Sequence, residues 1–322
     1  MVDTYQTRGL VEGALLAALT VVLVAMGFFI PWLFFISSIL FPVPIILMIY
    51  RQGLKKGFLS LITAYFLLLM LYPDPISITI FFMQFSPLGV LFGLLFKNRV
   101  SAGKSIFAGT VLAAVLTFVS IGLVIMLTGI STGELESQLK GEINHSMDLY
   151  QDINNLSDSE AEEMRQIMED FIDTMLLLLP SILIIGAMFS TLISYIISRT
   201  VLVRLNHDVL PLPPFSHWTY PWYTVWGIII GLAMMIIGDR YDYTTVATLG
   251  KNILYVFSFA FLLLGISVLA FYYKRAPISK GLKWLLIFLA ILLPLTPYLV
   301  VVMGVLDPLL DIRKLNQQHK EV

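Results

Sequence analysis

Residues 10–30 read LVEGALLAALTVVLVAMGFFI, and this stretch decides the fold. It carries a single charged side chain, that of Glu12, near its start. About 20 mostly apolar residues are enough for a helix to cross a bilayer, so we predict a membrane-spanning helix here. The stretch lacks the short apolar core and small-residue cleavage site of a signal peptide, so we expect the helix to remain in the mature protein.

The composition of the whole chain repeats this pattern. Of 322 residues, 58% are hydrophobic and 13% are charged, and the mean hydropathy is +0.88. Soluble domains carry about 25% charged residues. The sequence therefore predicts an all-α, polytopic transmembrane helical bundle of about nine spans. The predicted spans are residues 10–30, 34–50, 57–72, 76–96, 105–129, 171–197, 223–238, 253–273 and 282–306.

The distribution of basic residues between the loops predicts the orientation. Loops on the cytoplasmic side carry an excess of Lys and Arg. With the N-terminus inside, thirteen basic residues lie on the inner side and four on the outer side before the last span. We therefore expect a multi-pass membrane protein with a cytoplasmic N-terminus. The side of the tail stays open: nine crossings place Arg313 outside, whereas a break around Pro294 and Pro297 would turn the last run inward.

The spans fall into two blocks joined by a linker. Residues 1–200 hold six spans, and residues 223–322 hold about three spans and a tail. The linker, residues 201–222, contains a Pro-Leu-Pro-Pro run that is stiff and non-helical, and we expect it on the cytoplasmic side. Trp and Tyr residues crowd its end, where amphipathic rings prefer the membrane interface.

Residues 131–170 form a segment of soluble character on the predicted outer side. Eleven acidic and two basic residues give it a net charge of −9. Ser131 with Glu134, and Ser157 with Glu160, have the spacing of capping boxes, which predicts two helices in an antiparallel hairpin. The hairpin is interpreted either as a solvated acidic cap, or as a lid over an outward-facing cavity or a docking surface for a cationic ligand or another protein.

The sequence lacks the signals of catalysis and of metal binding. It contains no Cys, which excludes thiolate chemistry, and its four His residues are isolated from one another. The spans hold no nucleophile with a paired base and no pair of carboxylates. We therefore expect no catalytic residue, no metal site, no cofactor and no nucleic-acid partner, and we predict that the protein is not an enzyme. The partner that the composition implies is the lipid bilayer.

Polar residues inside the predicted spans are the candidate ligand-binding groups: Gln84, Ser86, Thr117 and Ser120. Pro87 follows the first two and frees a backbone carbonyl, while an amide side chain in hydrocarbon needs a hydrogen-bond partner. Such a break can line a cavity. The alternative is that Gln84 bonds a neighbouring helix, that Pro87 is a tolerated kink and that the hydroxyls bond their own backbone.

The first span carries a second candidate feature on its surface. Glu12 follows Arg8 by four residues, so the two side chains can pair along one helix face. Ala14 and Ala18 lie one turn apart and form a flat strip on which another helix can pack closely. We therefore predict that these two alanines are partner-helix contacts.

Several short motifs together resemble the YybS family of bacterial polytopic membrane proteins, a family of unknown function. They are RGLVEGA at residues 8–14, PVP at 42–44, RQG at 51–53, KKG at 55–57 and DPLLDIRK at 307–314. The resemblance covers most of the chain. It also implies that the first six spans are similar to the substrate-binding S components of energy-coupling-factor (ECF) transporters.

Likeness to an S component implies two binding surfaces. A small molecule would bind in the outer half, among the fourth to sixth helices, with Gln84 as a lining residue. Ala14 and Ala18 would contact an ECF-type transmembrane coupling subunit, which works with ATPases. The chain departs from S components in its extra C-terminal spans and in its acidic hairpin.

Two functional hypotheses follow. The first is S-component-like binding or transport of a small solute. The alternative is a non-transporting scaffold or regulatory protein that recruits a partner through the acidic outer hairpin or the basic inner loops. The sequence specifies neither the substrate, nor the energy coupling, nor the oligomeric state.

Overall fold

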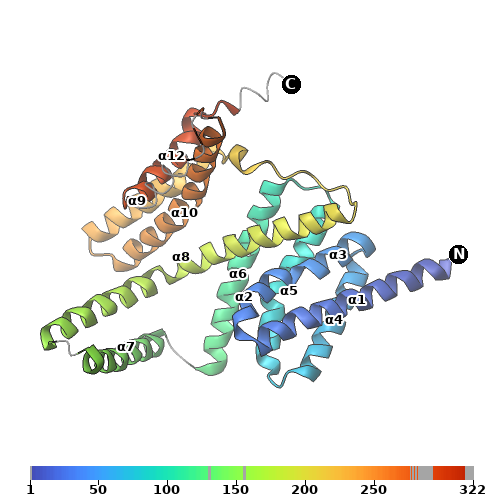
Figure 1. Ribbon diagram of the computed structural model, residues 1–322, viewed down its shortest axis with the longest axis horizontal. Coiled ribbons are helices and arrows are strands. Elements are labelled where there is room, and N and C mark those ends of the chain that lie inside the picture. Colours follow the sequence, from blue (N-terminus) through green and yellow to red (C-terminus); the bar gives the residue numbers. More distant parts are fainter. Residues whose placement is uncertain are drawn as a thin grey trace. The chain divides into compact units, whose positions relative to one another are not determined.

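The computed structural model describes residues 2–129, 132–154, 157–275, 277, 279, 281 and 293–315. Every regular element within these residues is helical, which confirms the predicted all-α fold (Figure 1). In this part of the chain, eight helical stretches are long and apolar enough to cross a membrane, with the interrupted stretch Pro31–Gln52 counted as one, and Thr296–Leu310 is a shorter apolar helix. Of the ninth predicted span, residues 282–292 lie outside the described residues.

The helices follow the predicted spans, with differences at the second and sixth. In chain order they are α1 (Val2–Phe29), η1 (Pro31–Leu33), α2 (Phe34–Leu40), α3 (Pro42–Gln52), α4 (Leu54–Leu71), α5 (Pro75–Lys97), α6 (Ala102–Thr128), α7 (Thr132–Asn154), α8 (Asp158–Arg204), η2 (Phe215–His217), η3 (Trp222–Thr224), α9 (Val225–Arg240), α10 (Thr244–Arg275) and α12 (Thr296–Leu310).

The contacts divide the chain into two compact units. The N-terminal unit comprises residues 1–135 and 186–211, and the C-terminal unit comprises residues 136–185 and 212–322. The boundary lies within α8, so the hairpin groups with the later helices. The sequence-based division instead placed the hairpin with the first six spans.

The second predicted span is broken into α2 and α3 rather than forming one helix. Pro42 has no backbone N–H to continue α2, but it is well suited to the first turn of a new helix. All residues from Pro42 to Ile49 are buried, and α3 packs against α1, α4 and α5. Helix α3 is therefore the centre of the N-terminal unit.

Glycines on the helices around α3 allow this close packing. A Cβ atom added at Gly57 would lie 2.3 Å from a side-chain carbon of Ile49, and one at Gly93 would lie 2.7 Å from its Cβ. The branched side chain of Ile49 therefore fills the space that these two glycines leave on α4 and α5.

The hairpin is present, but its second helix is continuous with the sixth span as the 47-residue helix α8. The capping box at its start is confirmed, because the Ser157 amide donates to Glu160 Oε2 at 3.0 Å and the Glu160 amide donates to Ser157 Oγ at 3.4 Å. Ser131, of the other predicted box, lies outside the described residues. Lys140 of α7 contacts Asp173 of α8 at 2.7 Å, and this carboxylate together with Glu136 raises the pKa of Lys140.

A side-chain amide from α10 repairs the backbone of α8 next to Pro180. The Ser181 amide donates to Asn252 Oδ1 at 2.9 Å, and Asn252 Nδ2 donates to the Leu177 carbonyl at 2.8 Å and to the Thr248 carbonyl at 2.9 Å. Asn252 therefore stands between the N–H and C=O groups that an undisturbed helix would join. Since hydrocarbon offers no other partner, this contact fixes α10 on α8.

The remaining helices of the C-terminal unit pack backbone to backbone through glycine. An added Cβ atom would lie 2.3 Å from the Ala247 amide at Gly238, 1.9 Å from the Val300 carbonyl at Gly265, and 2.0 Å from the Phe261 carbonyl at Gly304. Helices α9 and α10 form an antiparallel pair, and α12 lies against α10 (Figure 1).

Replacing the amide that bridges α8 tests its contribution to stability. We expect Asn252→Ala to lower the free energy of unfolding by about 1–3 kcal/mol, because it leaves a buried N–H and a buried C=O of α8 without partners. The measurement is denaturation of the purified protein in detergent micelles. Lys251→Ala is the control, because it removes only an exposed ion pair, 3.3 Å from Asp239, and should cost less than about 1 kcal/mol. Equal losses in the two variants would contradict the bridging role.

Candidate functional sites

The structure brings two of the four candidate ligand-binding residues together. Gln84 lies in the middle of α5, and its Nε2 donates to Thr117 Oγ1 of α6 at 3.3 Å. Thr117 in turn donates to the Ala113 carbonyl of its own helix at 2.9 Å. Helix α5 continues through Pro87 from Pro75 to Lys97. The geometry is that of an interhelical hydrogen bond with a tolerated proline.

The other two candidate residues differ from this pair. The Ser86 hydroxyl donates to the Phe82 carbonyl of its own helix. Ser120 lies one turn after Thr117 on α6, is buried, and has a hydroxyl without a hydrogen-bond partner among the described residues. Thr191 of α8 is a second buried hydroxyl in the same condition. Burying a hydroxyl without a hydrogen bond costs free energy, so Ser120 and Thr191 are candidate contacts for a polar ligand.

The faces of α5 differ in character. Phe81 and Phe82 are buried, and each ring lies 5.1 Å from the ring of Phe41, which lies between α2 and α3. This side of α5 is filled by edge-to-face aromatic contacts, which supply apolar contact and no polar group. Gln84 bonds instead to α6, so the polar groups of this region gather between α5 and α6.

A polar network joins α1 to the turn between α3 and α4. Glu12 contacts Arg51 at 2.6 Å and accepts a hydrogen bond from Gln52 Nε2 at 2.9 Å. Lys56 Nζ donates to Gln52 Oε1 at 3.2 Å. Glu12 therefore pairs with a distant arginine. The predicted partner, Arg8, has a side chain outside the described residues.

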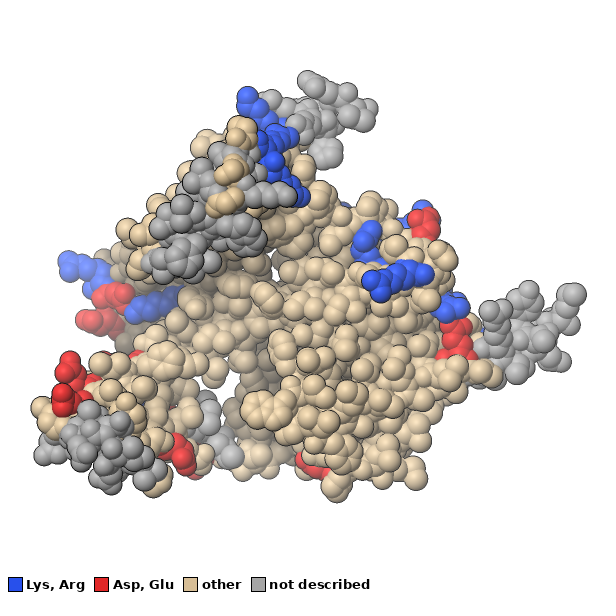
Figure 2. Space-filling model, in the orientation of Figure 1, with Lys and Arg blue, Asp and Glu red and all other residues tan. Residues whose placement is uncertain are grey.

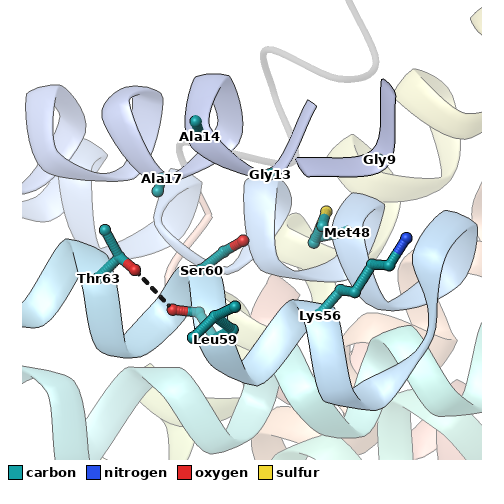
Figure 3. A pocket seen from close by; sticks show the side chains of 9 residues that line it. All are labelled: Gly9, Gly13, Ala14, Ala17, Met48, Lys56, Leu59, Ser60 and Thr63. Carbon is teal, nitrogen blue, oxygen red and sulfur yellow. Dashed lines mark hydrogen bonds between the residues drawn. The ribbon is translucent and has the colours of Figure 1, made fainter. Parts of the chain in front are cut away.

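A groove of about 200 Å³ runs beside this network, between α1 and α4 (Figure 3). Lys56 extends along one end of it toward Gly9, and the hydroxyl of Ser60 points toward α1. Met48 of α3 lies behind. The residues that line the groove are Gly9, Gly13, Ala14, Ala17, Met48, Lys56, Leu59, Ser60 and Thr63.

The two alanines predicted to contact a partner lie on the exposed side of α1. Ala14 and Ala18 are exposed, whereas Gly13, Ala17 and Val21 face the interior of the unit and are buried. Ala14 also borders the groove, and Ala18 does not. Helix α1 therefore presents one small-residue face to its own bundle and another outward.

The C-terminal unit holds a buried ion pair that sequence reasoning missed. The side chains of Arg313 and Asp307 are 0% and 5% exposed. Arg313 donates from Nε and Nη2 to the two oxygens of Asp307 at 3.0 and 2.6 Å. Its remaining N–H groups donate to the Ser216 and Trp218 carbonyls, at 2.8 and 2.6 Å, and to Ser267 Oγ at 2.9 Å. All five donors of the guanidinium are thus used.

This ion pair fastens the tail to the linker. Ser216 lies in η2 and Trp218 follows it, so both carbonyls belong to the segment between α8 and α9. Tyr272, near the end of α10, also donates to the Ile312 carbonyl at 3.0 Å. The tail through Arg313 therefore lies at the linker end of the C-terminal unit.

Charged side chains elsewhere gather in small groups separated by wide uncharged surface (Figure 2). Within the part of the chain that the structure describes, no three His, Asp or Glu side chains come close enough together to hold a metal ion. The broad uncharged surfaces suit a lipid environment.

The long apolar helices and the internally paired polar groups define a polytopic helical membrane protein. Residues 18–308 match the family described as predicted membrane protein (DUF2232), and the chain belongs to this family. It is 25% identical over 318 residues to the uncharacterized protein YybS of Bacillus subtilis (strain 168), a match that covers 94% of this chain and 96% of that protein. These findings confirm the resemblance to the YybS family. No solved structure matches the chain.

The residues of the two missed clusters were visible in the sequence only as short motifs. The RQG and KKG motifs contain Arg51, Gln52 and Lys56. The DPLLDIRK motif begins with Asp307 and has Arg313 as its seventh residue. The spacing of charged residues predicts Arg8 as a partner for Glu12, and it predicts no buried partner for Arg313. The contacts that join these motifs to distant segments required the folded chain.

The position of the tail can be tested by labelling, because the chain has no cysteine of its own. We expect Thr219→Cys in the linker and Val322→Cys in the tail to react with a membrane-impermeant maleimide under the same condition in spheroplasts, either both before lysis or both only after it. Ser146→Cys on α7 is the control for the opposite side. Labelling of Thr219→Cys and Val322→Cys on different sides would contradict the Arg313 contacts.

Proposed function

We propose that this chain is an S-component-like membrane protein that binds a small solute between α5 and α6, near Gln84, Thr117 and Ser120. The observation that carries the proposal is the hydroxyl of Ser120, which is unpaired within the described part of the chain and lies one turn along α6 from the hydrogen bond between Gln84 and Thr117. Gln84 is half-buried, and the buried hydroxyl of Ser120 has no partner among the described residues. Buried polar groups are normally satisfied, so a polar ligand that satisfied these would gain affinity.

The chemistry of the site favours a small, neutral and polar solute. An amide and two hydroxyls can donate and accept hydrogen bonds, but they carry no charge to balance an ion. The aromatic face of α5 lies nearby and would suit a ligand with an apolar or planar part. Ser86 bonds its own helix and is expected to contribute less than the other three residues.

The orientation proposed for the chain is that of a multi-pass protein of a bacterial inner membrane with its N-terminus in the cytoplasm. The excess of basic residues in one set of loops supports this orientation. The attachment of the tail to the linker adds Arg313 and Lys314 to that same side. The acidic hairpin then faces outward.

A coupling partner is proposed to dock on the exposed face of α1. Ala14 and Ala18 are exposed and small, and a helix of a second protein could approach closely there. Such a partner would be an ECF-type transmembrane coupling subunit with its ATPases. The support is the resemblance of the first six spans to S components together with the outward placement of both alanines.

The acidic hairpin supports a different candidate function, that of a non-transporting scaffold. Glu142, Glu162 and Glu163 are exposed, and Lys140 holds α7 and α8 together through Asp173. Two helices that are held together and expose acidic side chains form a surface that suits a basic partner protein. Recovery of one stoichiometric partner with no role in transport, lost when residues 131–170 are deleted, would favour this function over solute binding.

Thermal stabilisation by a metabolite library tests the solute-binding proposal. A solute at 100 times its Kd should stabilise the purified protein by about 2.7 kcal/mol, which raises Tm by several degrees. Gln84→Leu should remove this shift, whereas Thr200→Val, which removes a hydroxyl that bonds its own helix at the Ile196 carbonyl, should retain it. If no library member shifts Tm, or if the shift survives Gln84→Leu, the proposed site is wrong.

A further inference from the structure

The groove between α1 and α4 combines mostly small and apolar walls with a lysine at one end. Small and apolar side chains form its sides, including Ala14, Ala17 and Leu59, and Lys56 occupies one end (Figure 3). Ala14 and Leu59 are exposed, so the groove opens on the surface that faces lipid. The groove is therefore mostly apolar, with the hydroxyls of Ser60 and Thr63 on the α4 side, and it is cationic at one end.

The ammonium group of Lys56 has spare hydrogen-bonding capacity. It can donate three hydrogen bonds, and within the described residues it has one acceptor, Gln52 Oε1 at 3.2 Å. The nearest carboxylate network, at Glu12, is already occupied by Arg51 at 2.6 Å. A charged group of opposite sign could approach Lys56 without displacing an existing ion pair.

Further basic residues surround this end of the groove. Lys55 is exposed beside Lys56 at the start of α4. The ammonium of Lys97, at the end of α5, would lie 3.7 Å from a Cβ atom added at Gly53 in the turn between α3 and α4. Neither lysine forms an ion pair in the part of the chain that is described. Clusters of this kind at the end of a membrane helix attract anionic lipids.

The size of the groove decides between a lipid and a helix as its occupant. Along α1 the lining runs from Gly9 to Ala17, which is about 12 Å at 1.5 Å per residue. A helix about 10 Å wide could not enter a groove of this size and would lie across its mouth. A single hydrocarbon chain is much thinner than a helix.

We propose that this groove binds an anionic phospholipid, with the phosphate on Lys56 and one acyl chain between α1 and α4. The lipid comes from the leaflet that meets the Lys55 and Lys56 end of α4. Its site shares Ala14 with the docking strip proposed for a partner helix and does not include Ala18. The proposal stands independently of solute binding near Gln84.

The test compares lipids of opposite headgroup charge on the delipidated full-length protein. Phosphatidylglycerol and phosphatidylcholine with the same acyl chains are added, and bound lipid is counted by native mass spectrometry alongside Tm. We expect phosphatidylglycerol to bind at least tenfold more tightly and to raise Tm more. Lys56→Gln should remove this preference and Lys56→Arg should retain it. Lys104→Gln, which neutralises an exposed lysine at the start of α6, is the matched control and should retain it.

A second pair of variants tests the acyl chain. Ala14→Leu fills the groove from an exposed position and should weaken phosphatidylglycerol binding at least fivefold, whereas Ala18→Leu should leave it unchanged. Loss of a partner protein in both variants would instead report on the docking strip. Three outcomes would overturn the proposal: a preference that survives Lys56→Gln, equal binding to both alanine variants, or equal stabilisation by inorganic phosphate, which would indicate a free anion.

Discussion

The bilayer core offers no water to polar groups, and the structure of this chain depends on that constraint. Backbone and side-chain donors inside the membrane depend on partners within the protein, and the buried hydroxyls of Ser120 and Thr191 are exceptions among the described residues. Asn252 shows how this is done: its amide accepts from Ser181 and donates to Leu177, on either side of the gap that Pro180 makes in α8. One side chain therefore repairs a helix and joins it to a neighbour.

The same constraint explains the pairing of the charges. Arg313 uses all of its donors on Asp307, on Ser267 and on two carbonyls of the linker. Burying two charges is costly, and an ion pair of this kind contributes little net stability compared with apolar residues. It joins three segments, because the acceptors of Arg313 lie on the linker, on α10 and on α12. The tail is placed by hydrogen bonds rather than by the charge of the loops.

Much of the fold could be predicted from the sequence, because span length and hydropathy are local properties. The merging of the hairpin with the sixth span depends on packing and could not. The break at Pro42 could not either, since Pro87 and Pro180 lie inside continuous helices. The candidate site was predicted in part. The sequence indicates that Gln84 needs a hydrogen-bond partner, but not that the partner is Thr117, which lies 33 residues further along the chain. Glu12 shows the limit most clearly, since its ion pair with Arg51 joins residues that lie far apart in the sequence and on different helices.

The groove and the exposed alanines show that α1 serves two surfaces. Gly13 and Ala17 let α3 and α4 approach, and a Cβ atom added at Gly13 would lie 2.9 Å from the Met48 side chain. Ala14 and Ala18, on the outward side, leave room for a lipid or a partner. A helix rich in small residues thus packs inward while keeping an open outer face, which is the property that both proposals use.

The claim that internal pairing of polar groups fixes the helices is tested most directly by a double-mutant cycle on Asp307 and Arg313. Unfolding free energies are measured in lipid nanodiscs for Asp307→Leu, Arg313→Met and the double variant. Each single change leaves a buried group unpaired and should cost about 3–5 kcal/mol. The double variant should cost less than the sum of the two by at least about 1 kcal/mol. Strictly additive losses would contradict the account.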